Sequence, residues 1–120
     1  MNCDDSGTST VIQGEDRDLI LRIVDKLTQI PFDLTQATAI NARFAKADGT
    51  RLIKTVGNGV TIISAPAGKI DVFLSAAETA LLVAREEQSF EVEIVVGTGL
   101  SSRITVVQFL KALTVRGRAV

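Results

Sequence analysis

Short apolar segments, each ended by its own turn signal, follow one another along most of this chain. The turn signals are Gly14-Glu15-Asp16, Asp48-Gly49, Gly57-Asn58-Gly59, Ala65-Pro66-Ala67-Gly68 and Gly97-Thr98-Gly99. Segments of this length between Gly, Pro, Asn and Asp residues are typical of strands joined by tight turns. The chain has 120 residues and is 46% hydrophobic, which is enough for one domain with a buried core. We therefore expect an all-β fold, an antiparallel β-sandwich of seven to eight strands.

The pattern divides the chain into a flexible N-terminal segment over residues 1–9 and a single β-sandwich domain over residues 10–120. Strands are expected at 10–13, 19–25, 39–45, 51–56, 60–64, 69–74, 88–96 and 103–113. The 19–25 strand is apolar on both faces, which favours a central and well-covered position. Alternation predicts that Phe90, Val92 and Ile94 point into the core. Phe73 and Phe109 have the opposite parity to the main buried set of their strands, so a partner-facing orientation stays open for both.

One short helix is expected near 75–84. Ser75-Ala76-Ala77-Glu78 fits a capping box, in which the serine hydroxyl accepts from the amide of Glu78 and the glutamate reaches back to the serine amide. Alanine-rich sequence follows, with two leucines as anchors. The sequence thus predicts a helix of about two turns that crosses between the two sheets of the sandwich.

The residue types exclude the commonest catalytic arrangements. The chain has no histidine and one cysteine, so Ser-His-Asp, Cys-His and zinc sites are ruled out. Glu91 and Glu93 share the polar side of one strand, where an exposed face is the simpler interpretation. Glu15, Asp16 and Asp18 lack the ligand spacing of a calcium loop. We expect no catalytic residue, no metal and no cofactor.

The charge balance bears on the choice of partner. Thirteen basic and 14 acidic residues give a net charge of −1, without the basic face that nucleic-acid binding requires. No apolar run is long enough for a membrane span, and the acidic N-terminus lacks a signal-peptide core. The sequence therefore predicts a chain that is made in a cytoplasm and binds neither nucleic acid nor membrane.

The order of these features resembles a known family. A strand after Gly14-Glu15-Asp16, the segment Pro31-Phe32-Asp33-Leu34-Thr35, the Asp48-Gly49 turn and a strand–helix–strand block from Ile70 to Val96 follow one another. This order resembles the small immunoglobulin-like modules of tailed-phage virions, especially the N-terminal domain of baseplate upper proteins. The resemblance implies an immunoglobulin-like β-sandwich, made in the host bacterial cytoplasm and located in the virion.

The resemblance further implies a non-enzymatic structural subunit of a baseplate, tail, neck or head decoration. Its partners would be other virion proteins or copies of itself, bound through exposed strand edges. The first and last strands are the expected assembly surface, with the candidate residues Val11, Gln13, Arg103, Thr105, Val107 and Phe109. A ligand- or carbohydrate-binding β-sandwich module is the alternative, which the scarcity of aromatic residues weakens.

Overall fold

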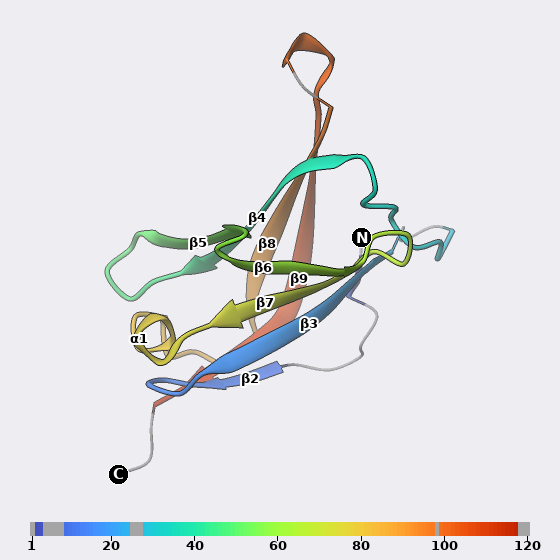
Figure 1. Ribbon diagram of the computed structural model, residues 1–120. Helices are drawn as coiled ribbons and strands as arrows, with labels where there is room; N and C mark the ends of the chain where they lie inside the picture. Colours follow the sequence, from blue (N-terminus) through green and yellow to red (C-terminus); the bar gives the residue numbers. More distant parts are fainter. Residues whose placement is uncertain (1, 4–8, 25–27, 98, 118–120) are drawn as a thin grey trace.

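The computed structural model describes residues 2–3, 9–24, 28–97 and 99–117 (Figure 1). The strands are β1 (Asn2–Cys3), β2 (Ser9–Ile12), β3 (Arg17–Val24), β4 (Ala37–Ala45), β5 (Arg51–Val56), β6 (Gly59–Ser64), β7 (Lys69–Leu74), β8 (Gln88–Val96) and β9 (Arg103–Arg116). The helical elements are α1 (Ala76–Thr79) and the 3₁₀ turn η1 (Gly99–Ser101). The predicted all-β class is confirmed. Within the segment expected to be flexible, residues 2–3 and 9 lie in strands, and residues 1 and 4–8 lie outside the described residues.

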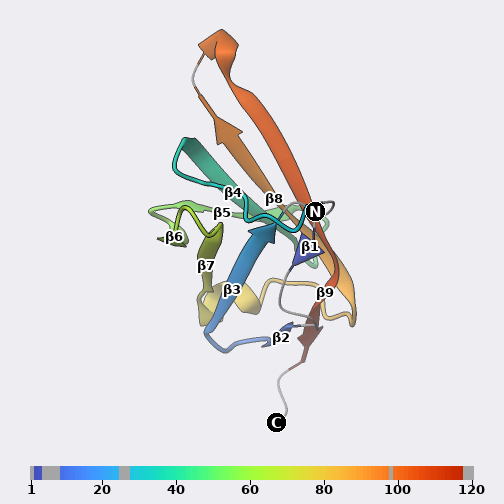
Figure 2. The ribbon, with the colours of Figure 1, turned by 90° about the vertical axis from the view of Figure 1, so that its right-hand side faces the viewer.

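The strands form one mixed sheet in the order β1-β3-β7-β6-β5-β4-β8-β9-β2, which curls into a nearly closed barrel (Figures 1 and 2). The prediction of a purely antiparallel arrangement is wrong, because two neighbouring pairs run parallel. β2 pairs with the end of β9 over residues 9–12 and 113–116, and β5 meets β6 through two residue pairs.

The core is filled by alternate residues of the strands, as the sequence predicts for β4, β7 and β8. Ile40, Ala42 and Phe44 of β4 are buried, as are the corresponding residues of β7 and β8. Three phenylalanine rings stack across this core. The ring centroids of Phe44 and Phe90 are 5.0 Å apart, and those of Phe90 and Phe109 are 4.9 Å apart. Such offset aromatic contacts add to the burial of apolar area.

β3 differs from the central, well-covered strand that its sequence predicts. It lies between β7 and the two-residue β1 near one end of the sheet, and no element covers its outer side in the described part of the chain. Leu19 and Leu21 are buried, whereas Ile20 is 43% exposed. Although β3 has apolar residues on both faces, the rest of the protein therefore buries only one of these faces.

α1 is a single turn, shorter than the two turns predicted over 75–84. The capping box is confirmed, because the Ser75 hydroxyl accepts from the amide of Glu78 and the Glu78 carboxylate accepts from the amide of Ser75. The helix ends early because the chain turns away to pair with another segment. The carbonyl of Leu81 accepts from the amide of Ala47 at 2.9 Å, and Leu82 forms a bridge with Lys46.

The hairpin of β8 and β9 projects beyond the rest of the molecule in both views (Figures 1 and 2). β9 is the longest strand, with 14 residues, and its pairing with β8 continues to Val96 and Arg103 at the far end. Leu100, in the turn at the tip, is fully exposed. This projection brings the end of the hairpin away from the core and leaves its side chains available for contacts.

Candidate assembly surface

The structure corrects three of the six predicted assembly residues. Val11, Val107 and Phe109 are at most 1% exposed and lie in the core. Their burial follows from the register of β9, in which Val107 and Phe109 lie opposite the buried Val92 and Phe90 of β8. Phe109 therefore belongs to the core, and Phe73, with 38% exposure, is the ring of the two that meets solvent.

The other three predicted residues do not form one surface. Gln13 is half-buried and its side-chain amide donates to the carbonyl of Leu82 at 2.8 Å, so it joins two loops inside the molecule. Thr105 is half-buried, and Arg103 is exposed at the beginning of β9. Of the predicted set, Arg103 alone remains fully available to a partner.

The exposed side of β9 is instead formed by the residues of the opposite parity. Ile104 is 62% exposed, Val106 is 47% exposed and Leu110 is 70% exposed. Large apolar side chains so exposed, and on one strand face, are typical of a surface that another molecule covers. Together with the outward residues of β8, β4 and β5 they make up what we call the outer face. Its members are Ile104, Val106, Gln108, Leu110, Ser89, Glu91, Glu93, Val95, Ala39, Asn41, Arg43, Ala45, Arg51, Ile53 and Thr55.

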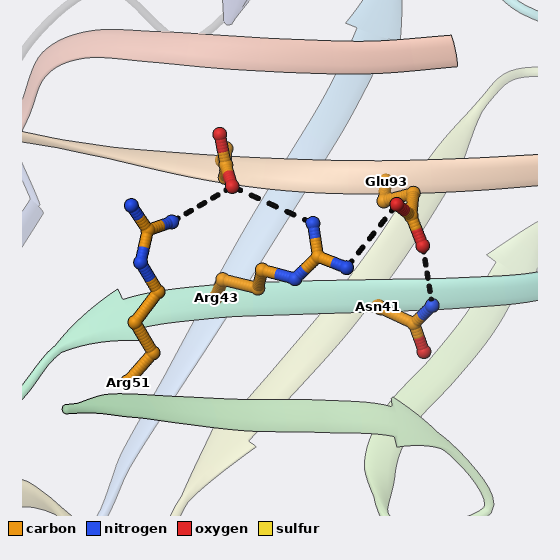
Figure 3. A network of polar contacts seen from close by, with 5 residues as sticks. Asn41, Arg43, Arg51 and Glu93 are labelled. Carbon is orange, nitrogen blue, oxygen red and sulfur yellow. Dashed lines mark hydrogen bonds and ion pairs between the residues drawn. The ribbon is translucent and has the colours of Figure 1, made fainter. Parts of the chain in front are cut away.

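Paired charges occupy the middle of the outer face (Figure 3). The guanidinium of Arg43 on β4 reaches both glutamates of β8, at 3.5 Å from Glu91 and 3.1 Å from Glu93. Arg51 on β5 lies 2.8 Å from the same oxygen of Glu91. The side chain of Asn41 donates to Glu93 at 2.9 Å. The network therefore links three neighbouring strands and carries two positive and two negative charges.

Glu93 of this network is held as a carboxylate. The hydrogen bond from Asn41 and the ion pair with Arg43 lower the pKa of Glu93. A carboxylate with a lowered pKa is a poor general acid, so Glu93 is poorly suited to the acid role in a two-carboxylate catalyst. The network suits a role in fixing the shape and charge of the face.

An open depression of about 380 Å³ adjoins the network on the outer face. It is lined by Arg43, Ala45, Arg51, Ser89, Phe90, Glu91, Gln108 and Leu110. Both arginines at its edge are already paired with Glu91. One side of the depression is thus polar and the other is apolar, and the charged residues in its lining are already paired with one another.

The acidic cluster singled out near the first turn has a structural role. Asp16 accepts from the amide of Ala76 at 2.7 Å at the start of α1, and the carbonyl of Glu15 accepts from the hydroxyl of Thr79. These bonds fasten the β2–β3 turn to the helix. Among the described residues, no three His, Cys, Asp or Glu gather closely enough to hold a metal ion.

Sequence reasoning missed Ile104, Leu110 and the ion network as parts of one face. Asn41 and Arg43 alternate in sequence with the apolar Ile40, Ala42 and Phe44, and this alternation is the signal that could have led to the network. The pairing of Arg43 with Glu91 depends on the register between β4 and β8, two strands about 50 residues apart in sequence. That register is a property of the fold and has no local sequence signal.

No protein-family model matches this chain, and no curated protein matches it. No helix of the described residues has the length and apolarity that crossing a membrane requires. The fold and the face define the class to which the protein belongs, an all-β domain with a mixed, nearly closed sheet and a projecting hairpin.

Proposed function

We propose that the protein is a non-enzymatic structural subunit of a phage or prophage virion that acts through protein–protein contacts. The observation that carries the proposal is the row of exposed apolar side chains on the projecting β8–β9 hairpin. Ile104, Val106 and Leu110 lie on one side of β9, outside the core that stabilises the fold. A subunit that must join a larger particle needs such a surface, whereas a self-sufficient monomer does not.

Within this proposal the fold is an immunoglobulin-like sandwich, which the strand order supports. In immunoglobulin domains, strands lettered in chain order form one sheet A-B-E-D and a second sheet that contains C-F-G. Here β3-β7-β6 and β5-β4-β8-β9 are the corresponding groups of neighbours. The position of α1 between β7 and β8, the strands that correspond to E and F, agrees with the same assignment.

The backbone of β9 offers a second means of attachment. On the side away from β8, its pairing within the described residues involves residues 113–116 alone. We infer that the edge of β9 over residues 103–110, nearer the tip of the hairpin, can pair with a strand of a neighbouring subunit. Burial of Ile104, Val106 and Leu110 would add roughly 1.5 to 3 kcal/mol per fully covered side chain. The partners are other virion proteins or copies of this chain.

A ligand-binding module is the second candidate function, and the depression beside Arg51 and Leu110 is the observation that favours it. A carbohydrate or other surface molecule would have to bind there against paired arginines and one phenylalanine. This candidate predicts that a ligand raises the melting temperature of the isolated protein. A panel of glycans measured with and without calcium tests it, and no shift with any of them counts against it.

The proposed function is tested by the composition of purified particles. Particles are isolated by density gradient from an induced culture that carries the gene, and their proteins are quantified by mass spectrometry. We expect the chain in a fixed ratio to the major particle proteins through successive gradients. A chain that stays with the soluble host proteins while intact particles form would contradict the proposal.

A further inference from the structure

The outer face is organised in cross-strand rows that are set by the register of four strands. Two rows cross all four strands, namely Val106, Glu93, Asn41 and Thr55 in the first, and Gln108, Glu91, Arg43 and Ile53 in the second. In each row the acidic residue lies on β8, and its partner on β4 is a hydrogen-bond donor. The two central strands therefore carry opposite charge along the middle of the face.

The arrangement of charges on β4 and β8 is self-complementary under a two-fold rotation. A two-fold axis parallel to the strands, between β4 and β8, places β4 opposite β8 of a second copy and β5 opposite β9. Arg43 then lies over Glu91 of the second copy, and Asn41 over its Glu93. Ile53 lies over Gln108 of the second copy, and Thr55 lies over its Val106. Because the operation is two-fold, every such contact forms twice.

The net charge of the outer face indicates which kind of partner surface it can bind. Arg43 and Arg51 balance Glu91 and Glu93, and all four are already paired within the subunit. A strongly acidic or basic partner would therefore meet no unbalanced charge. The outer face is complementary to another neutral face whose positive and negative charges lie in the reverse order. A second copy of the chain, rotated about the two-fold axis, presents such a face.

We propose that the outer face of β5-β4-β8-β9 is a docking surface for a second copy of this chain, with β4 and β8 facing each other across a two-fold axis. The inference rests on the proposed assembly function and names the partner of the outer face. Four strands and four rows span roughly 500 Å² at ordinary strand spacings. Two copies would thus bury about 1,000 Å² in total, near the lower end for a specific interface, so dimerisation depends on concentration.

A charge-swap experiment tests the pairing of Arg43 with Glu91 across the axis. Sedimentation equilibrium is measured on the full chain from about 1 µM to 1 mM, for the wild type, Arg43→Glu, Glu91→Arg and an equimolar mixture of the two variants. Each variant alone places like charges opposite each other, which weakens the dimer by more than about tenfold. The mixture restores opposite charges at both positions, so a heterodimer of the two variants is the expected result.

A second pair of variants covers the case in which a charge swap prevents folding. Val106→Glu places a charge on the outer face, and Ile63→Glu makes a similar change at an equally exposed residue of β6. We expect Val106→Glu to be monomeric and Ile63→Glu to dimerise as the wild type does. A monomeric wild type over the whole range, or a dimer that Val106→Glu leaves unchanged, overturns the inference. Neither result removes the chain from purified particles, so the proposed function is judged separately.

Discussion

The Nζ of Lys54 donates to Oε2 of Glu78 at 2.5 Å and so ties β5 to the capping box of α1. The lysine is buried and the glutamate is half-buried. Burial raises the pKa of Glu78, but the bonds from Lys54 and Ser75 outweigh it and lower this pKa below its ordinary value of 4.5. The pair thus stabilises the fold fully above pH 4.5 and less as the pH falls through the lowered pKa.

Lys54→Met should destabilise the protein by about 2 kcal/mol at pH 7, because it leaves a half-buried carboxylate without its cation. The loss should shrink at low pH, as the pH falls through the lowered pKa of Glu78 and its carboxylate becomes protonated. The double variant Lys54→Met/Glu78→Gln should recover part of the stability at pH 7. Urea unfolding at both pH values measures the effect, and a loss that is equal at the two pH values would contradict it.

Asp71→Asn should stabilise the protein at neutral pH. Burial raises the pKa of Asp71, and Asp18 raises it further. One of its carboxylate oxygens is buried without a hydrogen-bond partner. A carboxyl with a raised pKa reduces stability as the pH rises through its unfolded and then its folded pKa. We expect a melting temperature higher by about 2 to 4 °C at pH 7 and unchanged near pH 3. Calorimetry across this range checks the sign, and a lower melting temperature at pH 7 would refute the account of Asp71.

Phe109→Ala should cost about 3 to 5 kcal/mol, since it removes one ring of the stack and leaves a cavity in the core. Leu110→Ala, one residue further along β9, should cost less than about 0.5 kcal/mol because this side chain is exposed. Denaturant midpoints of the two variants compare the faces of β9 directly. Similar losses in both variants would show that the parity of β9 is misassigned.

Gly68→Ala should destabilise the protein by more than about 3 kcal/mol. Its φ is +65°, and a Cβ there would lie 2.5 Å from the carbonyl oxygen of Ile23 and 2.7 Å from that of Phe32. Gly49 also has a positive φ, but a Cβ there would meet nothing within 4 Å. Gly49→Ala should therefore cost only about 1 kcal/mol, the strain of the left-handed backbone. Thermal unfolding of the two variants separates close contact from backbone strain.

The sequence predicted best where one strand face was clearly apolar. Phe90, Val92 and Ile94 alternate with polar residues, and their side chains are buried as expected. The helix cap at Ser75 was equally readable, because its bonds are local in sequence. The end of that helix was not, since the amide of Ala47, about 35 residues away, binds the carbonyl of Leu81.

The assembly surface was the least predictable part. β9 carries apolar residues on both of its faces, so alternation alone could not show whether Val106 or Val107 is the buried residue. The register with β8 decides it, because Val107 lies opposite the buried Val92 and Val106 lies opposite Glu93 of the outer face. The parallel pairing of β2 with β9 likewise joins segments about 100 residues apart, for which the sequence offers no turn signal.

The most direct test of the assembly role is a competition for incorporation into particles. Val106→Glu and Ile63→Glu chains are produced together in one culture in place of the wild-type chain, and distinguishing peptides are quantified in purified particles by mass spectrometry. Both variants must first show wild-type melting temperatures. The account predicts that Val106→Glu is depleted from particles by more than about tenfold relative to Ile63→Glu. Equal incorporation of the two folded variants would contradict the claim that the outer face carries the assembly contact.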